Sequence, residues 1–175
     1  TIVSSAFRDK GLTQVTIPNS VITIGYQAFR GNQLREVTIP NSVTTIDNRA
    51  FENNQLNQII IPNSVTKIGE YAFAYSSLDS VSIPDSVTDI GSWAFSFNSD
   101  LDSVKLPKGL KKLRYFTFHH AALENIIWPE DRSGYRRQGS GYIGGQLNNS
   151  FYIRLFQILF NLLSQKTKYS ELLFA

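Results

Sequence analysis

The chain contains no cysteine, no methionine and only two histidines among its 175 residues. The absence of cysteine excludes a disulfide framework, a thiolate metal site and a cysteine nucleophile. Charged residues make up 18% of the sequence, below the roughly 25% of ordinary globular proteins. The formal net charge of +3 is too small to indicate a nucleic-acid partner by itself. We therefore predict a protein without thiol chemistry and without nucleic acid as its partner.

The residues that usually carry catalysis are not arranged as in an enzyme. His119 and His120 are adjacent, so they cannot both face one ligand from a regular strand, and no carboxylate stands at metal-ligand spacing from them. The glycine-rich stretch Gly139–Gly145 lacks the Lys-Ser/Thr that follows a phosphate-binding loop. No serine lies in the sequence context of a nucleophile elbow. The sequence therefore predicts no enzyme activity, no cofactor and no metal.

A fifteen-residue pattern recurs along most of the chain. Val15–Phe29 reads VTIPNSVITIGYQAF, Val37–Phe51 reads VTIPNSVTTIDNRAF, and Ile59–Phe73 reads IIIPNSVTKIGEYAF. The steps between equivalent leucines are 22, 22, 22, 23 and 22 residues, for Leu12, Leu34, Leu56, Leu78, Leu101 and Leu123. All six prolines stand at one position of the pattern, as Pro18, Pro40, Pro62, Pro84, Pro107 and Pro129. A period this short predicts a solenoid of stacked units.

Each unit predicts a short strand, a turn and a second apolar segment. In the first complete copy Val15 and Ile17 alternate with polar residues, as in a half-buried strand. Pro18 ends this strand because it has no N–H to donate, and the Asn-Ser pair after it favours a turn. Val21 and Ile24 then return to the interior in a short extended or 3₁₀ segment, and an Ala-Phe pair closes the unit. Stacked units share one core, in which each large side chain contributes roughly 1.5–3 kcal/mol.

The pattern L-x-x-V-x-I-P-x-S-V-x-x-I-x-x-x-A-F resembles the BspA-like, or Treponema-type, leucine-rich repeat over roughly residues 1–129. The resemblance implies an α/β-type repeat solenoid that is mainly β, with right-handed leucine-rich-repeat coils stacked over residues 1–130. It also implies a secreted, periplasmic or cell-surface protein of a bacterium that binds proteins or surface glycans in adhesion, without enzyme activity. The family usually has a cysteine three residues after the phenylalanine, where this chain has Asn32, Asn54, Ser76, Asn98 and Ala121. Asparagine there can bond to neighbouring backbone.

The outward-facing positions of the predicted strands give one candidate binding surface. Their side chains are mostly small, polar and mixed in sign, which suits either an extended partner or a merely solvated sheet face. The candidate residues of this strand face are Glu36, Gln58, Asp79, Ile60 and Lys105. Basic residues also accumulate from Lys105 onward, which favours an anionic partner or simple solubility.

Two other columns become aromatic toward the later repeats and give a second candidate surface. The position two residues before the repeat phenylalanine changes from Gln27 and Arg49 to aromatic side chains, and the position two residues after it changes in the same way. The aromatic members are Tyr71, Trp93 and Phe116 in the first column and Tyr75 and Phe97 in the second. Because the core positions are already filled in every repeat, these side chains indicate either a contact surface or local packing that caps the last coils.

The repeats end at Pro129, and the remaining residues have a different composition. Residues 131–149 are glycine-rich and predict a linker, and residues 150–175 contain a helix with a wide apolar face. Its thirteen most apolar residues would extend about 20 Å, too short for a bilayer that is about 30 Å thick. The predicted role of this helix is to cap its own solenoid or to form a homo-oligomeric contact, through Phe151, Leu155, Phe156, Leu159 and Leu162. Assembly through the helix is thus the alternative to a binding function.

Overall fold

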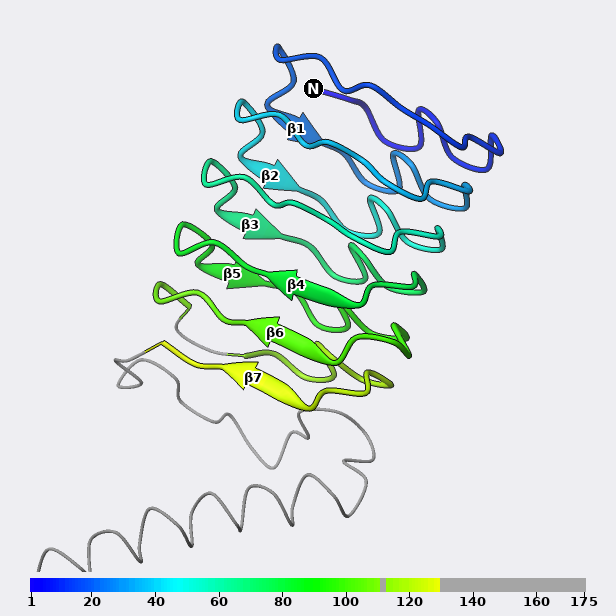
Figure 1. Cartoon of the computed structure of the whole chain (residues 1–175). Coiled ribbons are helices and arrows are strands. Elements are labelled where there is room, and N and C mark those ends of the chain that lie inside the picture. The colour runs from blue at the N-terminus through cyan, green and yellow to red at the C-terminus, as the bar shows by residue number, and fades with distance from the viewer. Residues whose placement is uncertain (111–112, 130–175) are drawn as a thin grey trace, which may run out of the picture. The chain divides into compact units, whose positions relative to one another are not determined.

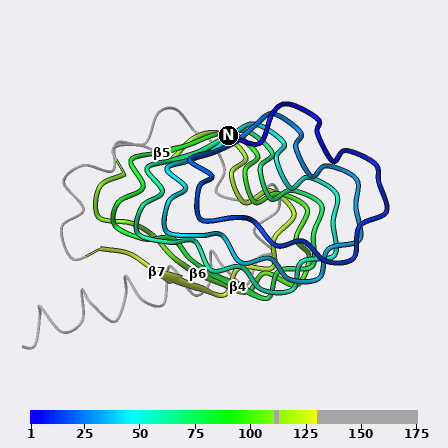
Figure 2. The same ribbon diagram turned by 90° about the horizontal axis from the view of Figure 1, so that it is seen from above.

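The computed structural model describes residues 1–110 and 113–129, which form a stack of short coils with one coil for each repeat (Figure 1). One parallel sheet has the order β1 (Thr23–Ile24), β2 (Thr45–Ile46), β3 (Lys67–Ile68) and β5 (Asp89–Ile90). A second parallel sheet has the order β4 (Ser80–Ser82), β6 (Ser103–Lys105) and β7 (Asn125–Ile127). Figure 2 shows that the two sheets run along opposite sides of the coils.

The strand register follows the repeat period of the sequence. Thr23 pairs with Thr45, one period of 22 residues away, and Lys67 pairs with Asp89 in the same way. Ser80 instead pairs with Ser103, because the fourth step is one residue longer. The extra residue lies in the turn at Ser99 and Asp100, outside both sheets. The predicted mainly β solenoid of stacked coils is therefore confirmed for the described residues.

The prediction assigned the strand of each unit to the first apolar segment. In the early coils the second apolar segment forms the more regular strand instead. The segment around Val15 and Ile17 was expected to be the strand, but in the early coils it contributes only the isolated bridges Thr16–Thr38 and Thr38–Ile60. The segment ending at Ile24, for which a short extended or 3₁₀ conformation was expected, is extended and forms the four-stranded sheet. In the later coils the first segment does form the predicted strands, as β4, β6 and β7, although the same proline follows it. The proline therefore limits the length of this strand without preventing it.

The interior of the stack is an unbroken column of apolar side chains. The repeat phenylalanines Phe7, Phe29, Phe51, Phe73, Phe95 and Phe118 lie face to face, with successive ring centroids 5.3–5.6 Å apart. The leucine, valine and isoleucine positions of the pattern are buried around them, including Leu34, Val43 and Ile46. The assignment of inward and outward positions along the pattern is therefore correct.

Buried asparagines tie three of the coils to the coil before them. The Asn54 side-chain amide donates to the carbonyl oxygens of Phe51 at 2.9 Å and Phe29 at 3.0 Å, and its Oδ1 accepts from the Leu34 N–H at 3.1 Å. Asn32 and Asn98 make the same set of bonds in their own coils. At the equivalent Ser76 the side chain is too short, and its buried Oγ finds no partner within the described residues. The predicted asparagine-to-backbone bonds are confirmed.

The predicted linker at 131–149 and the predicted apolar helix within 150–175 lie outside the described residues. Within residues 1–110 and 113–129, no helix is long and apolar enough to cross a membrane.

Candidate binding surface

Each coil closes through a turn that holds two residues in the left-handed backbone conformation. Their φ angles lie between 54° and 63° at Gln27, Arg49, Tyr71, Trp93 and Phe116, and at Asn53, Tyr75, Phe97 and His120. These are the two columns that the sequence analysis singled out, but their positive φ was not expected. Gly31 and Asn53 tolerate this conformation well, whereas other non-glycine residues held there cost of order 1–3 kcal/mol each.

In the late coils the first and last side chains of this turn point outward and those between them point inward. Ala72 and Phe73 are fully buried between Tyr71, which is half-buried, and Tyr75, which is exposed. The next coil repeats this arrangement, with Ala94 and Phe95 buried between Trp93 and Phe97. The outward side chains of successive coils therefore form two parallel columns outside the phenylalanine core.

The late members of both columns stack into one cluster. Tyr71 and Trp93 are stacked with centroids 5.7 Å apart, Trp93 and Phe116 with centroids 4.4 Å apart. In the other column Tyr75 and Phe97 are 4.3 Å apart. The columns also meet sideways, since the Trp93 and Phe97 ring centroids are 6.0 Å apart. All five aromatic residues expected from the sequence are thus brought together.

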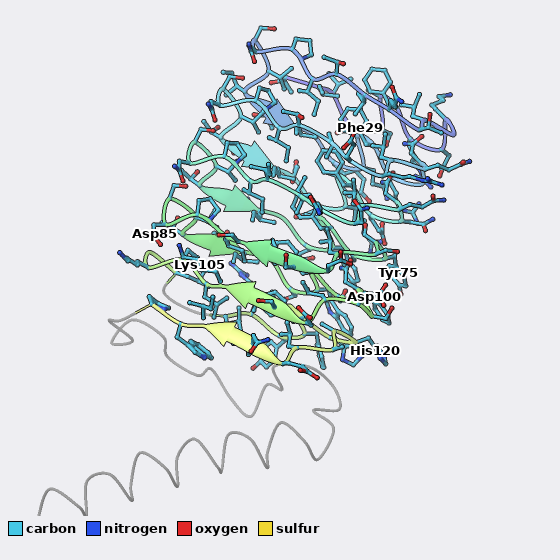
Figure 3. All side chains as sticks on the ribbon, in the orientation of Figure 1. Phe29, Tyr75, Asp85, Asp100, Lys105 and His120 are labelled. Atoms are coloured by element: carbon cyan, nitrogen blue, oxygen red, sulfur yellow. The ribbon has the colours of Figure 1, made fainter. Side chains whose placement is uncertain are left out.

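Two histidines complete this cluster: the repeat spacing already places His120 in the second column, two residues after Phe118, whereas His119 was not expected there. The ring of His119 stands nearly perpendicular to those of Trp93, Phe97 and Phe116, at centroid distances of 5.0, 5.6 and 5.3 Å. His120 lies 4.1 Å from His119 and 4.9 Å from Phe97. We define the aromatic surface as Tyr71, Tyr75, Trp93, Phe97, Phe116, His119 and His120. Figure 3 shows Tyr75 and His120 on the same side of the stack.

Acidification should loosen the aromatic surface through His119. Burial, together with the nearby His120, holds the pKa of His119 below its ordinary value, so the unfolded chain takes up a proton at higher pH than the folded one. The stability that this neutral ring contributes is complete above the ordinary histidine pKa of about 6.5 and falls as the pH drops below it. Thermal melts between pH 7.5 and 5.5 should decline more steeply for the wild type than for His119→Gln. Parallel declines would contradict this role.

A charged group adjoins the aromatic surface on its N-terminal side. The guanidinium carbon of Arg49 lies 4.5 Å from the centroid of the Tyr71 ring, a cation–π arrangement. Arg49 Nη1 is also 3.0 Å from Glu52, whose other carboxylate oxygen is 2.6 Å from Arg30 Nε. The Glu52 side chain is only 6% exposed. Arg30 and Arg49, which we call the arginine pair, therefore share one buried carboxylate. The three side chains together carry one positive charge in excess.

The strand face, in contrast, does not gather its predicted residues into one site. Glu36, Gln58 and Asp79 are all exposed, as expected, but Ile60 and Lys105 alone among the five predicted residues line a hollow. This open hollow has a volume of about 530 Å³. Ile60 is 82% exposed there, and Asp85 lies beside it. Asp85 and Lys105 lie toward the opposite side of the stack from Tyr75 in Figure 3.

Asp85 is held in place by the next coil. The Lys108 backbone N–H donates to Asp85 Oδ1 at 3.0 Å, and Lys108 Nζ is 3.6 Å from Oδ2. This backbone hydrogen bond is the main reason that the pKa of Asp85 lies below its usual value. The bonds make Asp85 a connection between coils, which weakens the case for this hollow as a binding site. The predicted cap or oligomer residues, from Phe151 to Leu162, lie outside the described part of the chain.

The described residues hold no constellation that would assign a reaction. No group of three histidine, cysteine or acidic side chains converges on a possible metal position within residues 1–110 and 113–129. What the fold does define is a class: a parallel solenoid of 22-residue coils with a leucine and phenylalanine core. Six copies of one family model match residues 1–124, and the chain belongs to that family, the BspA type leucine-rich repeat region.

Solved structures of leucine-rich repeat proteins have a similar fold. The T. pallidum leucine-rich repeat protein (TpLRR) is 33% identical with a TM-score of 0.68, over 72% of this chain and 61% of that one. A leucine-rich repeat protein from Bacteroides ovatus is 26% identical with a TM-score of 0.56, over 73% of this chain and 41% of that one. The chain thus spans less than two thirds of either relative. No curated protein matches it.

Proposed function

We propose that the protein is a non-catalytic binding module, and that its aromatic surface holds the ligand. The observation that carries this proposal is the presence of aromatic side chains at left-handed backbone positions. In the second column the early coils have Gly31 and Asn53, which tolerate this conformation, whereas the later coils have Tyr75 and Phe97 at a cost in backbone strain. In the first column every coil, early or late, places a non-glycine residue in this conformation. Strain of this kind is typical of sites that are kept for function.

The position of the rings supports a contact surface rather than a cap. A cap would cover the end of the phenylalanine core, but Tyr71, Trp93 and Phe116 follow one another along the side of three successive coils. The core has its own stacked phenylalanines beneath them. Tyrosine, tryptophan, phenylalanine and arginine are also the residues that protein interfaces favour. This composition suits a surface that a partner covers.

Substitution by the residues of the early coils should remove binding without unfolding the protein. The double variant Tyr71→Gln, Trp93→Gln copies Gln27, and Tyr75→Asn, Phe97→Asn copies Asn53. Each should weaken binding to an immobilised panel of matrix proteins and surface glycans at least about tenfold, since buried aromatic anchors dominate such contacts. Circular dichroism should show an unchanged fold.

The matched control is the double variant Glu36→Ala, Gln58→Ala on the strand face. It should bind the panel as the wild type does. If instead the control loses binding and the aromatic variants retain it, the ligand binds to the strand face of Glu36, Gln58, Asp79, Ile60 and Lys105.

Assembly remains the alternative function, because the sequence between Phe151 and Leu163 is too apolar to stay in water. On this alternative the wild type forms homo-oligomers, and Leu155→Glu with Leu159→Glu dissociates them. Light scattering at several concentrations decides the matter: a wild type that stays monomeric throughout, with this segment protected from protease, contradicts assembly and favours capping of its own coils.

The proposed setting is the one that the family resemblance implies, in the secreted, periplasmic or cell-surface fraction of a bacterium. Immunoblots of fractionated cells test this part of the proposal. Detection in the cytoplasmic fraction alone would count against it.

A further inference from the structure

We infer that the partner is a polypeptide, recognised as an extended segment that carries an acidic side chain next to apolar ones. This inference rests on the proposed binding function of the aromatic surface and makes it more specific. It follows from three features of that surface: which parts of the rings are still accessible, where the uncompensated charge lies, and how long the combined strip is.

Tyr71, Trp93 and Phe97 each have a neighbour on both faces of the ring. Tyr71 has the Arg49 guanidinium on one side and Trp93 on the other. Trp93 lies between Tyr71 and Phe116, and Phe97 lies between Tyr75 and His120. Nucleobases bind by stacking on open aromatic faces, and sugar rings dock on aromatic faces in the same way. Because the faces of these three rings are covered, the middle of the surface cannot stack against either ligand.

What the surface presents instead is a row of ring rims with polar groups among them. Tyr75 is 45% exposed and Tyr115, next to Phe116, is 50% exposed. Tyrosine and tryptophan combine a large apolar body with one hydrogen-bonding group, which suits apolar side chains and the polar backbone of a polypeptide at the same time. Apolar side chains need no stacking geometry, so they pack against rims as well as against faces.

The positive charge next to the rings favours a partner that carries a negative charge. Glu52 contacts Arg30 through Nε and Arg49 through Nη1. Each guanidinium has five N–H donors, so the arginine pair retains donors that can bind a carboxylate. Both arginines are partly exposed, with 28% and 35% of their side chains accessible. A second acid supplied by the partner would balance the excess charge of the pair.

The arginine pair and the aromatic surface together form a strip, and the length of this strip matches that of a short strand. From the arginine pair to Phe116 the strip crosses four coil spacings, and each spacing is close to the 5.3–5.6 Å that separates successive core rings. An extended segment of about six residues covers about 20 Å, which is about the length of that strip. The geometry therefore assigns the acidic side chain to one end of the segment and the apolar side chains to the other.

The test uses the full chain as bait for a display library of random twelve-residue peptides, with a glycan array in parallel. We expect enrichment of peptides that combine aspartate or glutamate with aromatic or aliphatic residues, and no comparable glycan signal. The peptide recovered most often is then synthesised, together with a copy in which its acidic residue is alanine. Both are titrated against the wild type, Arg30→Gln and Tyr75→Asn, Phe97→Asn, after melts have shown that each variant is folded.

Arg30→Gln should weaken binding of the acidic peptide about tenfold and leave binding of the alanine copy unchanged, because Glu52 then balances Arg49 alone. The aromatic variant should weaken binding of both peptides. Enriched peptides without an acidic residue, an equal loss for both peptides in Arg30→Gln, or glycan binding that depends on Tyr75 and Phe97 would overturn the inference while leaving the binding function in place. Unchanged binding in the aromatic variant would overturn the proposed function itself.

Discussion

Replacement of Ile61 by aspartate should unfold the middle of the coil stack. Ile61 is buried with 6% of its surface exposed, packed in the core between the equivalent isoleucines of the coils on either side. The change removes an apolar contribution of roughly 1.5–3 kcal/mol. It also places a carboxylate in a region of aliphatic side chains, where a charged group without a partner is far more costly still. We expect a loss above about 4 kcal/mol, which is exceptional for a single substitution.

The matched control is Gln58→Asp, three residues earlier on the same segment. Gln58 is exposed, so the same aspartate there should change the free energy of unfolding by no more than about 0.5 kcal/mol. Urea unfolding followed by circular dichroism compares the two variants directly. Equal losses for both would mean that the inward and outward positions of the coil have been assigned wrongly.

Asn54→Ser should lower the free energy of unfolding, whereas Ser76→Asn should raise it. Asn54→Ser removes the only side chain that bonds the Phe51 carbonyl oxygen and the Leu34 N–H within the described residues. Phe29 keeps a second donor in Asn32. Each buried backbone group left without a partner costs about 1–3 kcal/mol. We therefore expect a loss of about 2–4 kcal/mol in the free energy of unfolding.

Ser76→Asn is the reciprocal change. By the register of Asn98, an amide at this position would bond the Leu56 N–H and the carbonyl oxygens of Phe51 and Phe73. It would also replace the buried Oγ that has no partner among the described residues. The expected gain is about 1 kcal/mol, read from the midpoint of urea unfolding. A loss at both positions would show that the asparagines are not the ties between coils.

The sequence predicts the core of this protein well because the core depends on spacing alone. A period of 22 residues places Phe29, Phe51 and Phe73 in one column, and the alternation around each proline separates inward from outward positions. The columns containing Tyr71 and Trp93 are visible in the sequence for the same reason. Their meeting with His119 depends on the left-handed turns and on the small Ala74 and Ser96 between the columns, which the pattern alone does not reveal.

The arginine pair was missed because it depends on Glu52, which contacts Arg30 in the preceding coil and Arg49 in its own coil. Arg30 and Glu52 are separated by one repeat period, and Arg49 and Glu52 by three residues. A comparison of charges at a spacing of 22 residues would have found the first of these pairs. The strand face was overestimated, since exposure and polarity do not show whether side chains converge, and only Ile60 and Lys105 of its five residues share a hollow.

Footprinting with hydroxyl radicals tests most directly whether the aromatic surface is the binding site. The protein is oxidised alone and with the peptide recovered most often from the display library, and the protected side chains are located by mass spectrometry. We expect protection of Tyr71, Tyr75, Trp93 and Phe97, with Ile60 on the strand face oxidised equally in both samples. Protection of Ile60 with unchanged oxidation of the four aromatic residues would contradict this expectation.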